Sequence, residues 1–209
     1  DIGINSPNEI LVNTTNLAIN VAYVYTLTTP TGCSNTQTAT VSVKPTPLLT
    51  SLITTAAICS GSIFNYTPVS NVTGTTFTWT RIAQAFITNI AGSGTNDPAE
   101  KLFNSSVNTV NVDYTYTLLA SGCSSTQTVT VPVNPIPVVS NQVITTCSNT
   151  AFSVKPGTAP VGTKYTWTLP VYTPLGSITG GTAQTIPQDS ISELLVNQTL
   201  VSASARYTV

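Results

Sequence analysis

The chain has 209 residues, of which 41% are hydrophobic and only 6% charged, and its formal net charge is −1. This composition favours folded β-strands over disorder, because disordered chains are usually charged and poor in apolar residues. Six basic residues, spread thinly, exclude the cationic patch that nucleic acid or an anionic membrane surface needs, and the apolar runs are too short for membrane insertion.

Residues 1–44 predict the C-terminal part of a first β-sandwich. Apolar residues alternate with polar ones along the stretch that contains Tyr23 and Tyr25, and they do so again over 38–43. A turn at 30–33 joins the two stretches, so this segment predicts a β-hairpin with the tyrosines on its core face.

Residues 45–134 predict one complete β-sandwich. Pro45 and Pro47 begin it, as Pro135 and Pro137 begin the next segment, because proline cannot donate to a sheet ladder. Strands are expected over 48–58, 63–67, 75–80, weakly near 86–90 and over 101–104, with a break at 92–94. The clearest pattern is a final hairpin over 110–118 and 127–133, with a turn at 121–124.

Residues 135–209 predict the N-terminal part of a third β-sandwich. Tyr207 aligns with Tyr114, at the start of the long hairpin strand, so the final strand has no counterpart in this segment. No segment shows a helical period, and turn signals recur about every 8 to 12 residues. The predicted fold class is therefore all-β, with tandem immunoglobulin-like Greek-key β-sandwich repeats of about 90 residues. The end units are expected to be completed either by more of the same chain or by neighbouring subunits.

Short motifs support this periodicity. Cys33-Ser34 recurs as Cys123-Ser124, and Thr78-Trp79-Thr80 recurs as Thr166-Trp167-Thr168. A third motif with Glu, Leu and Asn at alternate positions occurs three times, beginning at Glu9, Glu100 and Glu193. Repeated domains of this kind usually provide reach and spacing rather than one reaction.

The middle segment resembles the PKD-like, immunoglobulin-like repeats of large Bacteroidota cell-surface proteins. The resemblance covers 45–134 well and the flanking segments more loosely. It implies an extracellular protein, an adhesin or a gliding- or filament-associated protein, exported by the type IX route, with a structural role. The matching stretches are Ile58–Gly61, Thr75–Thr80, Leu102–Ser106, Val112–Thr117, Gly122–Ser124 and Val129–Pro135.

Two cysteines per unit, in a chain that resembles secreted proteins, predict one disulfide per unit. Cys59 and Cys123 are the candidates in the middle unit, and Cys33 and Cys147 would then have partners outside the chain. In a plain immunoglobulin-like order, however, the two positions lie at opposite ends of the sandwich, and bonding requires Cα atoms within about 7 Å. The alternatives are a bond across a domain junction or reduced thiols.

Aromatic and acidic residues offer little chemistry. Each tryptophan lies in an alternating strand, which favours a core position over a sugar-stacking platform. Asp97 and Glu100 are close in sequence, but the other units offer no matching pair for the two carboxylates of a glycosidase. Without histidine or a Cys-x-x-Cys motif, no metal, other cofactor or catalysis is expected. The predicted core residues are Phe77, Trp79, Tyr114, Tyr116 and Trp167.

Glycosylation remains open. Five asparagines begin N-x-S/T sequons, but asparagine and threonine are abundant here and also suit strand ends. Ser190 is a weak match to an O-glycan acceptor of the Asp-Ser/Thr-apolar type. The sequon asparagines are Asn13, Asn65, Asn71, Asn104 and Asn197.

Two functions from different classes fit these observations. The first is a structural repeat segment of an extracellular adhesin, stalk or filament, with further copies of the same repeat as partners. The second is a carbohydrate-binding or accessory module of a secreted enzyme, with surface glycans as partners. An exposed aromatic strip would favour the second function, and buried tryptophans would favour the first.

Overall fold

The computed structural model describes residues 7–157 and 159–209. Within these residues every regular element is a β-strand and no helix forms, as the sequence predicts. The chain divides into two compact units. One comprises 110–133 and the described residues up to 104, and the other comprises 105–109 and 134–209. The first six residues of the predicted segment 1–44 lie outside the described residues.

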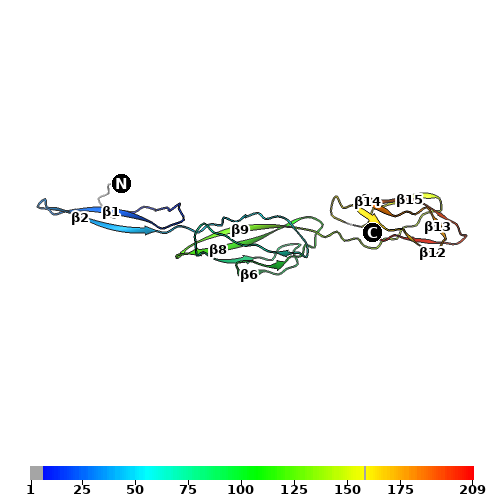
Figure 1. Cartoon of the computed structure of the whole chain (residues 1–209), viewed down its shortest axis with the longest axis horizontal. Coiled ribbons are helices and arrows are strands. Elements are labelled where there is room, and N and C mark those ends of the chain that lie inside the picture. Colours follow the sequence, from blue (N-terminus) through cyan, green and yellow to red (C-terminus); the bar gives the residue numbers. More distant parts are fainter. Residues whose placement is uncertain (1–6, 158) are drawn as a thin grey trace. The chain divides into compact units, whose positions relative to one another are not determined.

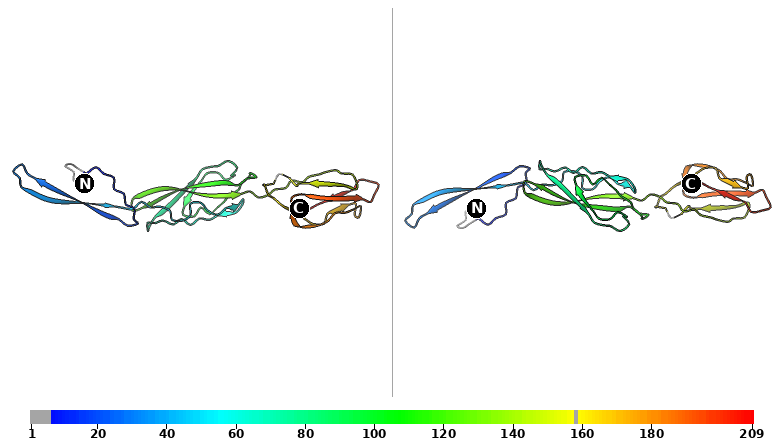
Figure 2. Two further views of the ribbon diagram at one scale, coloured as in Figure 1. Left: turned by 90° about the horizontal axis from the view of Figure 1, so that it is seen from above. Right: turned by 90° about the horizontal axis from the view of Figure 1, so that it is seen from below.

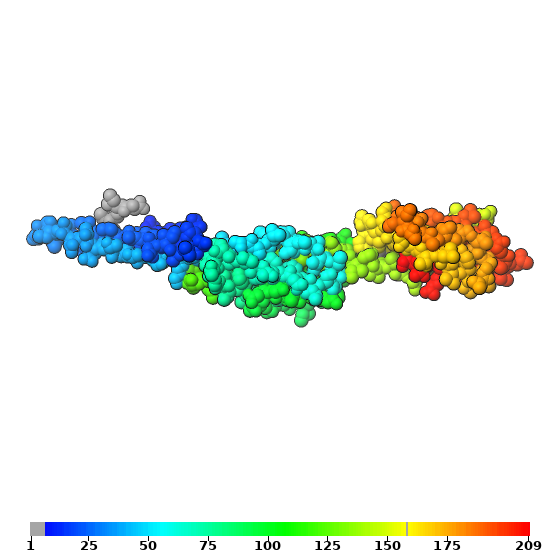
Figure 3. All heavy atoms as spheres, in the orientation of Figure 1, coloured from blue at the N-terminus to red at the C-terminus, as the bar shows by residue number. Residues whose placement is uncertain are grey.

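Strands β1 (Ile19–Thr28) and β2 (Ser34–Val43) form an antiparallel hairpin. They pair without a break, from Ile19 opposite Val43 to Thr28 opposite Ser34. Most side chains of this hairpin are exposed on both faces, and Figure 3 shows its side chains, in blue, open to solvent. Tyr25 is 39% exposed, so the predicted core position of this tyrosine is wrong for the chain by itself.

A five-stranded sheet in the order β3-β9-β8-β5-β6 forms the larger layer of the middle β-sandwich. A second, short sheet pairs β4 with β7. Figures 1 and 2 show β8 and β9, in green, as the long strands that run side by side through this unit. The strands are β3 (Ile58–Cys59), β4 (Ile63–Phe64), β5 (Thr76–Arg81), β6 (Gly92–Thr95), β7 (Glu100–Lys101), β8 (Val110–Ala120) and β9 (Cys123–Asn134).

The alternating sequence of β8 and β9 determines which side chains enter the core. In β8 every second residue is buried and the residues between are exposed, which is the two-residue period of a strand with one face in the core. Ser121 and Gly122 form the turn with φ of 51° and 85°. Positive φ at both central residues is what a tight hairpin turn of the I′ type requires. The sequence thus predicted this hairpin and its core face correctly.

The core of the middle β-sandwich is built around two fully buried tyrosines, Tyr114 and Tyr116. The Tyr114 ring lies 5.0 Å from the Phe64 ring and 5.3 Å from the Trp79 ring, measured between centroids. Phe77 is only partly buried and packs against this cluster from its margin. The other buried members are Tyr66, Ile87, Leu102, Val112, Leu118, Val129, Val131 and Val133.

The expected first strand over 48–58 is divided between two neighbours. Thr50 N donates to Val69 O, whereas Thr55 N donates to Thr130 O on β9. The segment therefore pairs first with the residues around Val69 and then with β9, and it forms only isolated bridges before β3. The predicted break at 92–94 is wrong, because these residues belong to β6, which pairs with β5.

Residues 134–209 form shorter strands around a smaller core of Tyr165, Trp167 and Ile191. Phe152 and Tyr207 pack against this core with their rings 6.2 Å apart. β15 pairs with β10 and β13, while β14 pairs with β11 and β16 with β12. The strands are β10 (Thr150–Val154), β11 (Tyr165–Trp167), β12 (Val171–Thr173), β13 (Ile178–Thr179), β14 (Gln184–Gln188), β15 (Ile191–Asn197) and β16 (Ser204–Arg206).

Candidate functional site

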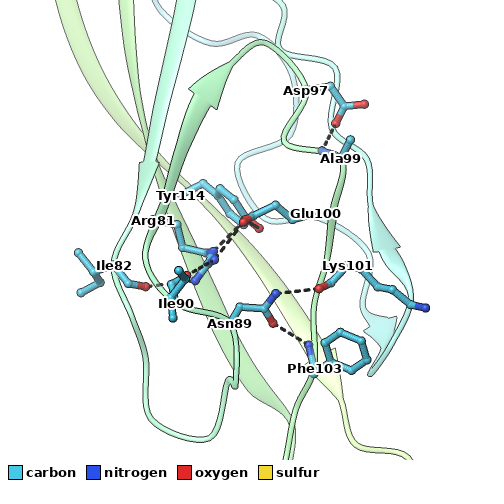
Figure 4. A network of polar contacts seen from close by, with 10 residues as sticks. All are labelled: Arg81, Ile82, Asn89, Ile90, Asp97, Ala99, Glu100, Lys101, Phe103 and Tyr114. Atoms are coloured by element: carbon cyan, nitrogen blue, oxygen red, sulfur yellow. Dashed lines mark hydrogen bonds and ion pairs between the residues drawn. The ribbon is translucent and has the colours of Figure 1, made fainter.

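A polar network of Arg81, Glu100 and Tyr114 lies inside the middle β-sandwich (Figure 4). The Arg81 side chain is 1% exposed, and its Nε donates to Glu100 Oε2 at 2.9 Å while its Nη2 donates to Oε1 at 3.0 Å. Tyr114 Oη donates to Oε2 at 2.6 Å, and Arg81 Nη2 also donates to Ile90 O at 2.7 Å. The network therefore joins β5, β7 and β8 through charge-assisted bonds.

The network stabilises the charged forms of Arg81 and Glu100 and the neutral form of Tyr114. Burial alone would raise the pKa of Glu100, but hydrogen bonds from Arg81 and Tyr114 and the Arg81 charge hold that pKa below its ordinary value. The bond to Glu100 raises the pKa of Arg81. Burial, followed by the bond to Glu100, raises the pKa of Tyr114. An ion pair with a protonated phenol beside it is thus the stable state at neutral pH.

This network does not have the parts of a hydrolytic site. Asp97, the acidic neighbour of Glu100 in sequence, accepts the backbone N–H groups of Tyr66 at 2.8 Å and Ala99 at 3.1 Å through its Oδ1. Asp97 therefore stabilises a turn. The two carboxylates of a glycosidase would instead face each other across the substrate. Across the described part of the chain, no group of three or more acidic, cysteine or histidine side chains could hold a metal ion.

The same glutamate–tyrosine bond occurs in all three segments. Tyr23 Oη donates to Glu9 and Tyr207 Oη donates to Glu193, and each pair is 14 residues apart, like Glu100 and Tyr114. The sequence motif contained the three glutamates, but their bond to tyrosine was not predicted. The constant spacing of the two residues was the signal that could have identified it.

The sequon asparagines of the repeated motif have structural roles. Asn104 is 8% exposed, and its Nδ2 donates to Val133 O at 2.8 Å. Asn13 Nδ2 donates to Val43 O at 2.7 Å, and Asn197 Nδ2 donates to Val201 O at 2.8 Å. An N-linked glycan would be attached to this same nitrogen. These amides close turns and bind strand ends, which favours the structural role that the sequence also suggests for the motif, and glycosylation of the three asparagines stays a prediction.

The remaining glycosylation candidates stay predictions. Asn65 is exposed beside β4, whereas Asn71 is half-buried and its Oδ1 accepts Leu48 N at 2.7 Å. Ser190 is half-buried, and its Oγ lies 3.3 Å from Ser153 Oγ and 3.2 Å from Ser192 Oγ. Asn65 is thus the candidate whose surroundings leave most room for a sugar.

The four cysteines are free thiols, and the predicted Cys59–Cys123 disulfide is absent. Cys123 begins β9, whereas the segment that leads to Cys59 runs parallel to β9 from the bridge of Thr54 with Thr130. At about 3.3 Å per residue, β9 spans about 23 Å between Cys123 and Thr130 alone. The thiols therefore lie at opposite ends of the sandwich, far beyond the roughly 7 Å that a disulfide tolerates between Cα atoms.

Both tryptophans are buried. Trp79 is 5% exposed and Trp167 is 7% exposed. Trp167 Nε1 donates to Thr182 O at 3.1 Å. An open hollow of about 370 Å³ lies over Trp167, lined mostly by polar side chains of β14 and β15 such as Gln184 and Glu193. Neither indole offers a free face on which a sugar ring could stack.

Glycines in β6 allow the sheet to approach the Trp79 ring closely. A Cβ at Gly94 would lie 2.8 Å from Trp79 Cζ2 and 2.9 Å from its Cε2, which is closer than a packed carbon tolerates. This contact explains why a glycine-rich stretch forms a strand here.

We expect Gly94→Ala to lower the free energy of unfolding of the middle unit by about 1–3 kcal/mol, because the rigid indole cannot move aside. Urea titration followed by Trp79 fluorescence in a Trp167→Phe background measures the change. Ser93→Ala, one residue away on the same strand, is the control and should have little effect. An unchanged midpoint for Gly94→Ala would show that β6 can shift without cost.

Comparisons with known proteins agree with this picture for the middle segment. A family model described as PKD-like domain matches residues 56–137. A search of curated proteins finds no match to the chain. The described residues contain no helix of the length and apolarity needed to span a membrane. Residues 56–137 thus match an all-β, immunoglobulin-like module of a kind that is generally structural or ligand-binding and typical of extracellular proteins.

Proposed function

We propose that the chain is a structural repeat segment of an extracellular bacterial adhesin, stalk or filament, which provides reach and spacing and not catalysis. The observation that carries this proposal is the glutamate–tyrosine bond that forms at the same spacing in three segments. A device that recurs along a chain and only joins strands is typical of a repeated scaffold.

The aromatic residues also support a structural role. Tyr114 and Tyr116 are fully buried, and the two tryptophans are nearly so. A β-sandwich that buries its aromatic side chains in the core becomes more stable, since each aromatic pair contributes about 0.5–1.5 kcal/mol of stability beyond the area that it buries. The Pro-x-Pro sequences after Lys44 and Asn134 separate successive β-sandwiches in this proposal.

The resemblance to Bacteroidota surface repeats supports a cell-surface location and export by the type IX route. In this proposal the partners are further copies of the same repeat, in one long chain or in neighbouring subunits. All five sequon asparagines and Ser190 remain glycosylation candidates in this proposal, and Asn65 is the exposed one beside β4.

The second candidate function, carbohydrate binding, depends on the polar hollow near Trp167. Its lining includes Asp189, Glu193 and glutamine side chains, which can bond sugar hydroxyl groups. The indole beneath contributes little, because it is 7% exposed and its N–H is already bonded to Thr182. The hollow therefore lacks the stacking surface on which sugar-binding modules usually depend.

Two measurements test the proposal. Antibodies raised against the chain should label the surface of intact cells that produce it, and labelling should disappear when type IX secretion is inactivated. The purified chain should give no signal on a glycan array. Labelling only after cell lysis would contradict the extracellular location, and selective glycan binding lost in Gln184→Ala would favour the carbohydrate-binding module instead.

A further inference from the structure

We propose that the middle unit cleaves its own backbone between Asp97 and Pro98, in a reaction that each molecule performs once. The Asp97 carboxylate is the nucleophile, and one water molecule completes the reaction. This inference goes beyond the proposed function and does not depend on where the protein is located. Three observations carry it: the Asp-Pro sequence, the hydrogen bonds that hold the Asp97 side chain, and the backbone conformation on both sides of the bond.

The bond between Asp97 and Pro98 combines a nucleophile with a suitable leaving group. It is the only Asp-Pro sequence in the 209 residues. An aspartate carboxylate that attacks the main-chain carbonyl carbon of its own residue closes a five-membered ring, and such an intramolecular attack is fast when the groups are held together. Proline follows as a tertiary amide without an N–H group, and its basic ring nitrogen leaves readily once it is protonated. These two residue types together therefore make one peptide bond of the chain susceptible to cleavage.

Two backbone N–H groups hold the Asp97 side chain in place. Its Oδ1 accepts Ala99 N at 3.1 Å, a bond that Figure 4 shows, and Tyr66 N at 2.8 Å. The bond to Ala99, two residues further on, is an Asx turn, which folds the side chain back along the Asp97–Pro98 peptide unit. Tyr66 is 7% exposed, so the second bond fixes the carboxylate against the core. Within the described chain no hydrogen bond reaches Asp97 Oδ2, which leaves this oxygen available for attack.

The backbone is strained beside the bond. Asn96 and Ala99 have φ of 54° and 47°, and the left-handed region is unfavourable for alanine because its Cβ approaches the following carbonyl oxygen. The sandwich holds this turn in place, since Asn96 N donates to Phe77 O at 3.2 Å and Tyr116 Oη donates to Asn96 O at 2.9 Å. Strain that the surroundings maintain is typical of reactive sites. Cleavage would free Ala99 from its unfavourable conformation.

The reaction has two steps. In the first, an Asp97 carboxylate oxygen bonds to the main-chain carbonyl carbon of the same residue, the bond from that carbon to Pro98 N breaks, and Pro98 N takes a proton from the solvent. Asp97 is then a cyclic anhydride. In the second, one water molecule opens the ring and leaves the side-chain carboxylate beside a new C-terminal carboxylate. Asp97 and Ala99, on either side of the buried Pro98, are exposed, so solvent reaches the turn.

The cut falls between β6 and β7 and leaves the two fragments paired. Residues 1–97 contain β1 to β6, and residues 98–209 contain β7 to β16. β5 pairs with β8 from Thr76 opposite Leu119 to Thr80 opposite Thr115, and β4 pairs with β7. The cut middle unit therefore stays folded, but only non-covalent contacts join its two parts. The fragments should separate on a denaturing gel and stay together in native buffer.

The experiment follows the purified full chain at about pH 5, where carboxylates that are paired in the native state remain ionised. Intact-mass spectrometry should find one fragment that ends at Asp97 and another that begins at Pro98. The native chain should be cut at least about tenfold faster than the same chain unfolded in urea, a factor that corresponds to about 1.4 kcal/mol. Added hydroxylamine should trap the anhydride, so that part of the first fragment ends in a hydroxamate.

Three variants separate the parts of the mechanism. Asp97→Asn keeps an acceptor for the two N–H groups but removes the nucleophile, so cleavage should fall below detection. Ala99→Gly keeps the Asp-Pro bond and relieves the strain, because glycine adopts positive φ freely, so cleavage should slow toward the rate in urea. Asp113→Asn changes an exposed carboxylate on β8 that accepts Thr130 Oγ1, and this matched control should be cut like the unaltered chain.

The urea midpoint of each variant shows whether its fold is retained. A native rate no faster than the rate in urea would overturn the proposal, and so would cleavage that persists in Asp97→Asn or a first fragment that never carries a hydroxamate. An unchanged rate in Ala99→Gly would contradict the contribution of backbone strain. Each of these results leaves the proposed structural function untouched, because that function is tested by cell-surface labelling.

Discussion

Glu100→Ala is expected to lower the free energy of unfolding of the middle unit by about 3 kcal/mol. The substitution leaves Arg81, with its side chain 1% exposed, as a buried cation without its two carboxylate bonds. Breaking a buried ion pair by removing one partner costs about 3–5 kcal/mol, and the low end applies because Glu100 is itself 21% exposed. Urea unfolding followed by Trp79 fluorescence, in a Trp167→Phe background, measures the loss.

Two further variants separate the ion pair from general damage. Asp113→Ala removes an exposed carboxylate on the same sheet that only accepts Thr130 Oγ1, and it should have a much smaller effect. Arg81→Leu combined with Glu100→Ala should lose less stability than Glu100→Ala alone, because no buried cation remains. If the double variant were the less stable one, the bidentate pair would not be the source of the loss.

The sequence correctly predicted those strands that stay in one sheet along their whole length. The final hairpin alternates strictly and lies in one sheet, so both its register and its buried face could be derived from Val112, Tyr114 and Tyr116. The first strand could not be derived in this way. Its residues pair first with Val69 and then with Thr130, and alternation does not show that a segment changes partners.

The missed features of the candidate site have a common cause, since each depends on residues far apart in sequence. Gly94 suits a strand only because Trp79 lies beneath it, and glycine by itself indicates a break. The bond between Glu100 and Tyr114 links two strands, so only the repetition of its spacing at Glu9 and Glu193 could reveal it. The predicted cysteine pairing followed from the count of two cysteines per unit, although the expected strand order already placed Cys59 and Cys123 at opposite ends of the sandwich.

Tyr114→Ala is expected to be the most damaging single change and to cost at least 4 kcal/mol, which would leave the middle unit partly unfolded in water. The side chain is fully buried, its ring packs 5.0 Å from Phe64 and 5.3 Å from Trp79, and its hydroxyl bonds Glu100 at 2.6 Å. Truncating a large buried aromatic residue costs about 3–5 kcal/mol, and the lost bond adds to this. Two measurements report the change: greater solvent exposure of Trp79, seen in its fluorescence, and a lower urea midpoint of unfolding.

Tyr23→Ala is the natural comparison, because Tyr23 has the same place in the hairpin motif and the same bond to a glutamate 14 residues earlier. Its surroundings differ, since no second layer covers the hairpin of β1 and β2 in the described chain and the side chain is only half-buried. The substitution should therefore cost much less stability than Tyr114→Ala, and urea unfolding of the two variants measures the difference. Equal losses for Tyr23→Ala and Tyr114→Ala would mean that the bond to glutamate, and not the surrounding core, determines what this tyrosine contributes.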